Sequence, residues 1–204
     1  MTGDGTDDDV RSWVARTYGG LADLLAAGPD GTWDAPTLCE GWAVRHVVAH
    51  VAMPVRLSPE QFGAELAAAG GDFGRLSDTV AARDAALPPA EHLAALRSPV
   101  LHVWQPPGGG AAGALSHAVV HSLDVTVALG RPAVAPAEAV TAVLDALAAA
   151  DGAVFGIDLT GVRLEATDTA WSRGDGEVVR ADGGSLVALL AGRRLPDGRV
   201  LPRR

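Results

Sequence analysis

Apolar residues recur at helical spacing through the first three quarters of the chain, and this periodicity limits the folds that the chain can adopt. In the segment 43–53, one helix face carries Val44, Val47, Val48 and Val51. Such a stripe must be buried against another element. The apolar residues are mostly Ala, Leu and Val, and aromatic residues make up only 4% of the chain. This mixture favours close-packed helices over a β-sandwich.

Stretches rich in glycine and proline divide the chain into segments. They are expected to separate four main helices, at about 9–27, 43–53, 114–129 and 136–150, with shorter helices between the second and the third. The stretch WQPPGGGAAG is expected to be a flexible loop, and Pro54 to end or kink the second helix. The first eight residues are acidic and are expected to be disordered.

After residue 150 the sequence changes character. The stretches GVRLEATD, AWSRGDG and EVVRADGG indicate short strands and tight turns, and SLVALLAGR indicates a last helix. The predicted fold class is therefore mainly α, with a four-helix bundle over 1–150 and a small α/β segment over 151–204. This segment is too short for a large substrate domain and is expected to cap one side of the bundle.

Charge and composition exclude several classes of protein. A net charge of -9 without a basic patch argues against binding to a phosphate backbone. No apolar run approaches the roughly 18 residues of a membrane span, and the N-terminus lacks the features of a signal peptide. Cys39 is the one cysteine, so no internal disulfide can form. We expect a cytoplasmic protein that binds neither nucleic acid nor membrane, and its alanine-rich helix faces would permit a homodimer.

Two pairs of histidines have the spacing of metal ligands on a helix. His117 and His121 lie four residues apart, and so do His46 and His50, so each pair projects from one helix face. A helix can offer two imidazole nitrogens to one metal ion in this way, and a bundle can turn two such helices inward. His50 aligns with the valine stripe and is predicted to face the interior. The alternative is that the histidines are packed and hydrogen-bonded in a core.

The other histidines and a nearby carboxylate lead to different predictions. His92 and His102 lie in poorly patterned segments and are predicted to be surface residues. Asp124 lies one turn after His121 on the same face, where it could accept a ring N–H from a metal ligand and fix its tautomer. The alternatives are a carboxylate in water or a partner for Arg131.

Three stretches resemble one protein family. TLCEGWAVRHVVAHVAM resembles the start of the mycothiol-dependent maleylpyruvate isomerase-like family, part of the DinB-like superfamily, in which a Thr-x-Cys-x-x-Trp loop leads into a helix with a histidine. HAVVHSLDVTVALGRP resembles its second hallmark, and LEATDTAWSRGDGEVVRADGGSLVALLAGR resembles its C-terminal segment. The three stretches follow the family's order and cover about half of the chain.

The resemblance implies a four-helix bundle that holds a divalent metal, usually zinc, through three side chains at one end. Carried over to this chain, the ligands are His50, His117 and His121. Many members have a glutamate in place of His117, and the replacement retains a ligand. His46 stands where the family usually has an aspartate, and its role is left open.

The resemblance also implies thiol chemistry. Mycothiol would be deprotonated at the open metal position, and the thiolate would add to, or be transferred onto, an electrophilic small molecule. Arg193 matches the family's terminal arginine and is predicted to bind an anionic group, with a surface arginine as the alternative. Asp124 and Arg193 are the predicted catalytic residues. Trp42 is predicted to pack at the cofactor site, and Cys39 to be a buried apolar residue rather than a nucleophile.

Two other functions remain open from the sequence. In the first, the bundle keeps a metal for stability or sensing, and His46 or a carboxylate closes the fourth coordination position. In the second, the chain has lost the metal and its histidines are merely packed.

Overall fold

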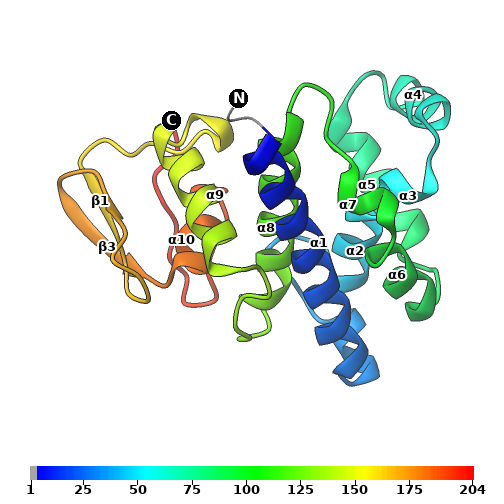
Figure 1. Cartoon of the computed structure of the whole chain (residues 1–204), viewed down its shortest axis with the longest axis horizontal. Coiled ribbons are helices and arrows are strands. Elements are labelled where there is room, and N and C mark those ends of the chain that lie inside the picture. The colour runs from blue at the N-terminus through cyan, green and yellow to red at the C-terminus, as the bar shows by residue number, and fades with distance from the viewer. Residues whose placement is uncertain (1–3) are drawn as a thin grey trace.

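The computed structural model describes residues 4–204, with side chains from residue 7 onward, and most of this range is helical (Figure 1). α1 (Asp4–Ala27) lies along α8 (Gly110–Thr126), and α2 (Val44–Val51) packs against α8 and α5 (Phe73–Asp84). These helices form the bundle. The sequence-based expectation gave the fourth place to the segment 136–150, but that segment forms α9 (Ala137–Ala149), which packs chiefly against α10 (Gly183–Leu190), and α5 takes its place beside α2. The mainly α fold class predicted from the sequence is confirmed.

Short helices connect the long ones on the side of α2. They are η1 (Asp30–Asp34), α3 (Met53–Arg56), α4 (Pro59–Ala68), α6 (Pro89–Leu96) and α7 (Pro99–Val103). All but η1 carry a proline in the first turn, where its missing N–H costs no hydrogen bond within the helix. Pro54 therefore ends the helix before it and opens α3, as the sequence predicts.

Three helix positions differ from the sequence-based expectation. α1 begins at Asp4, so the expectation of disorder is wrong for residues 4–8, whereas residues 1–3 lie outside the described part of the chain. α7 lies in a stretch whose periodicity predicts no helix. α8 begins at Gly110, within the glycine-rich stretch predicted to be a loop. A Cβ at Gly113 would collide with the ring of Pro106, so glycine permits this turn to pack closely against the preceding chain.

The C-terminal part contains a small sheet. β1 (Val162–Ala166) lies between β2 (Ser172–Arg173), to which it is antiparallel, and β3 (Glu177–Ala181), to which it is parallel. The turn between β2 and β3 contains Gly174 and Gly176, both with positive φ. A side chain at either position would overlap a backbone carbonyl oxygen, so both glycines are required for the turn.

The last helices attach this part to the bundle. α9 (Ala137–Ala149) is followed by the short η2 (Ala153–Phe155), and α10 (Gly183–Leu190) begins directly after β3. α10 packs against α9 and α8. A Cβ on Gly184 would come within 2.8 Å of the Leu123 side chain, so glycine allows α10 to approach α8 closely. The chain after α10 also reaches α8, because Arg193 contacts Asp124.

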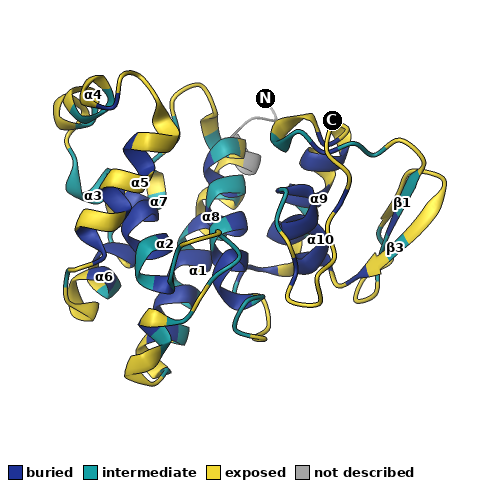
Figure 2. Ribbon diagram, turned by 180° about the vertical axis from the view of Figure 1, so that it is seen from behind, coloured by how far each residue is buried: buried dark blue, intermediate teal, exposed yellow. Residues whose placement is uncertain are grey.

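One hydrophobic core extends through both parts of the chain. Figure 2 shows buried residues along the facing sides of the helices and exposed residues on β3 and on α4. The core includes Leu21 of α1, Leu123 of α8, Leu144 of α9 and Leu186 of α10. The domain boundary at residue 150 stays a prediction, and the core is continuous across it. No helix in the described range has the length and apolarity needed to cross a bilayer.

His92 contradicts the prediction of a surface residue, because only 1% of it is exposed. Its ring stacks on Trp33 with centroids 5.5 Å apart, and its Nδ1 lies 3.2 Å from Nη2 of Arg56. These partners belong to η1 and α3, so the pattern of α6 alone does not predict them. Burial, followed by the charge of Arg56, lowers the pKa of His92 to about 4.

Replacing His92 with phenylalanine is expected to reduce the amount by which the free energy of unfolding falls at acid pH. The unfolded chain takes up a proton at His92 below pH 6.5, whereas the folded chain resists protonation until about pH 4. The stability that depends on neutral His92 is complete above pH 6.5 and lost as the pH falls toward 4. This loss should reach about 3 kcal/mol in the wild type and be missing in the variant.

Urea unfolding of both proteins at pH 7.5, 6 and 4.5 measures this difference. The absolute stability of the variant will also fall because Arg56 loses a partner, so the change with pH is the quantity to compare. Parallel stability curves for the two proteins would contradict the assignment.

Candidate metal centre

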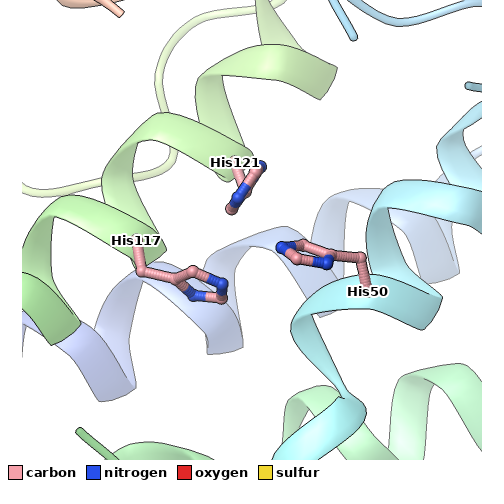
Figure 3. A group of neighbouring side chains, drawn as sticks. All are labelled: His50, His117 and His121. Carbon is pink, nitrogen blue, oxygen red and sulfur yellow. The ribbon is translucent and has the colours of Figure 1, made fainter. Parts of the chain in front are cut away.

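Three histidine side chains converge between α2 and α8. His50 comes from α2, and His117 and His121 come from successive turns of α8 (Figure 3). The ring centroid of His50 lies 5.3 Å from that of His117 and 4.8 Å from that of His121, and the centroids of the two rings on α8 are 4.7 Å apart. One ligand nitrogen from each ring lies within 4.8 Å of the other two. The structure thus brings together the three residues predicted as metal ligands.

Two of the rings are oriented by a second hydrogen bond. Nδ1 of His117 lies 2.9 Å from the hydroxyl of Tyr18 on α1, and Nδ1 of His121 lies 2.9 Å from Oδ2 of Asp124. Each bond leaves Nε2 of the same ring available. Tyr18 is 1% exposed, and burial raises its pKa, so it stays a neutral hydroxyl. Sequence reasoning missed Tyr18, although it follows Val14 by four residues on the apolar face of α1.

The protonation states of His50 and His117 suit metal binding. Burial, followed by the neighbouring ring of His121, lowers the pKa of His50 to about 3. The same causes lower the pKa of His117 well below its ordinary value. Both rings are therefore neutral near pH 7 and keep a lone pair for a cation.

The chemistry of this set fits a divalent ion. Neutral imidazoles are preferred ligands of Zn²⁺, and three protein ligands are the number found in sites that react with small molecules. Nδ1 of His50 is buried and has no hydrogen-bond partner in the described part of the chain. Unpaired ring nitrogens are uncommon in protein interiors and point to a group that binds there.

Asp124 is fully buried and accepts several hydrogen bonds. Besides His121, Arg193 contacts it twice, with Nε 2.7 Å from Oδ1 and Nη2 3.0 Å from Oδ2. Burial alone would raise the pKa of Asp124, but the hydrogen bonds from His121 and Arg193 outweigh it and hold the pKa below its usual range. Asp124 is therefore an ionised interior carboxylate, and the alternatives of a solvated carboxylate or a partner for Arg131 are wrong.

The loop before α2 is attached to the same carboxylate. The Cys39 thiol donates to Oδ2 of Asp124 over 3.0 Å, and the backbone N–H of Leu38 donates to the carbonyl oxygen of Asp124 over 3.0 Å. Burial, followed by the charge of Asp124, raises the pKa of the half-buried Cys39 thiol. A protonated thiol is a poor nucleophile. The expectation of a buried apolar residue is wrong, because Cys39 is half-buried and hydrogen-bonded. Cys39, His121 and Asp124 also have potential ligand atoms within 4.8 Å of one another.

Trp42 and His46 take different positions around His50. The ring of Trp42 lies 5.3 Å from that of His50, and its Nε1 donates to Asp78 over 3.2 Å. His46 accepts the N–H of Ala43 at its Nδ1 and so caps the first turn of α2. His46 is outside the converging group, and this geometry does not offer it as a fourth ligand.

One hollow adjoins two of the histidines, and another adjoins Arg193. One, of about 470 Å³, is lined by His50 and His117 together with apolar side chains of α3, α4, α5 and α7. The other, of about 460 Å³, is lined by Arg193, Arg194 and Arg203 beside Leu38 and Glu40. The first is apolar and the second is rich in cations.

Comparisons with known proteins give one family model and two similar solved structures. A family model described as the mycothiol maleylpyruvate isomerase N-terminal domain matches residues 14–105, a range that contains His50 and ends before α8. Crystal structures of the mycothiol-dependent maleylpyruvate isomerase and of a point mutant each align with TM-score 0.58 and 15% identity, over 97% of this chain and 96% of that chain. At this identity the structural likeness shows the fold. A search of curated proteins gave no significant match.

Proposed function

We propose that the chain, which matches the model of the mycothiol maleylpyruvate isomerase N-terminal domain at residues 14–105, is an enzyme that uses a divalent metal and mycothiol to act on an electrophilic small molecule. The observation that carries the proposal is the convergence of three imidazoles, two of which line a cavity. The family supports the thiol, and the donor set supports the metal, for which Zn²⁺ is the preferred ion.

His50, His117 and His121 would hold the ion. When bound, a divalent ion with an open position lowers the pKa of a thiol there, so that the thiolate can attack an electrophilic carbon. Tyr18 and Asp124 keep the rings of His117 and His121 in one orientation, which preserves their donor nitrogens for the centre. Trp42 flanks the ring of His50.

The surroundings of the histidines support an enzyme over a purely structural metal site. A structural site usually has four protein ligands. Here His46 is engaged in capping α2, and the side of the group toward the cavity is lined by apolar residues. A small molecule can therefore occupy the remaining position.

We assign Arg193 a positioning role toward Asp124 and, through its free edge, an anion-binding role. Its Nε and Nη2 are both bonded to Asp124, which keeps that carboxylate aimed at His121. The same guanidinium lines the cationic hollow with Arg194 and Arg203. An anionic or strongly polar part of the thiol would bind there.

The proposal is tested by metal analysis and a thiol-adduct assay. Protein purified without chelator should contain about one divalent ion per chain, and it should form an adduct between mycothiol and 1-chloro-2,4-dinitrobenzene in a metal-dependent manner. Removal of the metal should stop the reaction, and added Zn²⁺ should restore it. The cobalt-substituted protein should show a spectrum that changes when mycothiol is added. A metal site with four protein ligands, or no turnover with any thiol, would contradict the proposal.

A further inference from the structure

The apolar hollow beside the histidines has the dimensions of a substrate site. Its volume of about 470 Å³ lies within the range of roughly 300–1,000 Å³ that is typical of small-molecule pockets. Its walls come from α3, α4, α5 and α7 and from the chain that leads into α8. They include Met53, Leu57, Phe62, Phe73, Val100 and Trp104.

Aromatic rings stand on both sides of the histidines at the mouth of this hollow. The ring of Trp104 lies 5.2 Å from that of His117 in an edge-on arrangement. The ring of Phe73 lies 6.4 Å from that of His50, and Phe62 lies 6.4 Å from Phe73. Flat aromatic molecules bind favourably between such rings through stacked and edge-on contacts. Phe73 and Val100 remain 54% and 52% exposed, so apolar area at the mouth is still open to a ligand.

The walls offer no charge for an anionic ligand. Among the residues that line the hollow, all of which lie in the described part of the chain, there is no arginine, aspartate or glutamate, and the polar ones are Gln105 and the two histidines. A carboxylate that entered would find no cationic side chain in the walls, and the open position of the ion that the histidines are proposed to hold would be taken by the thiolate, so the carboxylate would lose its water without gaining a partner. Arg193 lines the other hollow and is already paired with Asp124.

We propose that this hollow binds the electrophilic substrate and selects uncharged aromatic molecules over carboxylates. The proposal rests on the function proposed above and names the substrate class of that site. When the substrate is a haloarene and the thiol is transferred, a C–S bond forms at the ring carbon that carries the halogen. The carbon–halogen bond breaks, the halide leaves and the thiol proton passes to solvent. The cationic hollow lined by Arg193, Arg194 and Arg203 would then bind the thiol.

A matched pair of electrophiles tests the selectivity. With mycothiol and the metal-loaded protein, kcat/KM for 1-chloro-2,4-dinitrobenzene should exceed that for 4-chloro-3,5-dinitrobenzoate by at least about 30-fold after correction for the uncatalysed rates. The unreactive analogues 1,3-dinitrobenzene and 3,5-dinitrobenzoate provide a second readout by calorimetry, in which the neutral compound should bind at least about 10-fold more tightly.

Phe73→Arg places a cation at the mouth of the hollow. It should reduce or reverse the preference for the neutral compound, both in kcat/KM and in binding. Phe73 is largely exposed, so this variant is expected to fold. Val154→Arg adds the same charge at a residue that is 61% exposed on η2, outside the hollow, and should leave the preferences unchanged. Equal use of the two electrophiles, or tighter binding of the carboxylates by the wild type, would overturn the selectivity. Absence of reaction with both would count against the proposed function, while the binding measurement would still decide the selectivity of the hollow.

Discussion

Replacement of His50 with alanine is expected to abolish stoichiometric metal binding and metal-dependent turnover. Two of the three donors come from one helix, so loss of His50 leaves a pair on α8 with no donor from α2. Removing even an outer partner of a metal ligand typically costs 10–100-fold in affinity, so removal of a ligand should weaken binding by more than about 100-fold. Competition with a chromophoric zinc chelator measures the affinity, and the adduct assay measures turnover.

His46→Ala is the matched control, because it removes a histidine one turn earlier on the same helix. Its expected cost is the cap of α2, about 0.5–2 kcal/mol of the free energy of unfolding, with the metal retained. If His50→Ala bound Zn²⁺ as tightly as the wild type while remaining folded, His50 would not be a ligand. If His46→Ala lost the metal, the assignment of His46 to capping would fail.

The convergence of the histidines was predictable because it depends on regular geometry. Four-residue spacing puts His117 and His121 on one face of any α-helix, whatever its neighbours. The valine stripe of α2 had to face the core, and His50 lies on its border, so the stripe indicated which histidine of α2 would point inward. These two regularities, together with the resemblance to the family, were enough to choose the three predicted ligands.

The partners of these rings depend on tertiary contacts that periodicity does not encode. Tyr18 and His117 are 99 residues apart, and Asp124 and Arg193 are 69 residues apart. Each contact requires a particular rotation of one helix against another. The error on His92 has the same origin, since its burial is produced by η1 and α3 rather than by its own helix.

Helix ends were predictable where a local signal marks them and not elsewhere. Proline marks the starts of the short helices correctly. The first turn of α8 consists of small residues with no apolar period, so sequence reasoning assigned it to a loop. Gly113 in this turn packs closely against the ring of Pro106, a contact that only the folded chain reveals.

Asp124 connects parts of the chain that are far apart in the sequence. Its carboxylate contacts a predicted metal ligand, the loop that precedes α2, and Arg193 in the chain after α10. It therefore connects α8 to the C-terminal part, whose approach to α8 is made possible by Gly184. Loss of its charge should affect both the histidine site and the stability of the whole chain.

Asp124→Asn is expected to destabilise the fold by about 3–5 kcal/mol, because it leaves the guanidinium of Arg193 without its buried anion. The amide has only one oxygen to accept the bonds of His121, Cys39 and Arg193, and its NH₂ group would face other donors. His121 would lose its fixed orientation, so metal affinity should fall by about 10–100-fold. Urea unfolding of the metal-free protein and zinc competition measure the two effects separately.

Asp145→Asn is the matched control, since this exposed carboxylate accepts one hydrogen bond from Trp171 and its change should cost less than about 1 kcal/mol. Combining Asp124→Asn with Arg193→Met removes the unpaired charge and should recover part of the lost stability, but not the metal affinity, because His121 still lacks its carboxylate. Wild-type stability in Asp124→Asn would show that the Asp124–Arg193 pair does not hold the C-terminal part to the bundle. Unchanged metal affinity would show that His121 is oriented without Asp124.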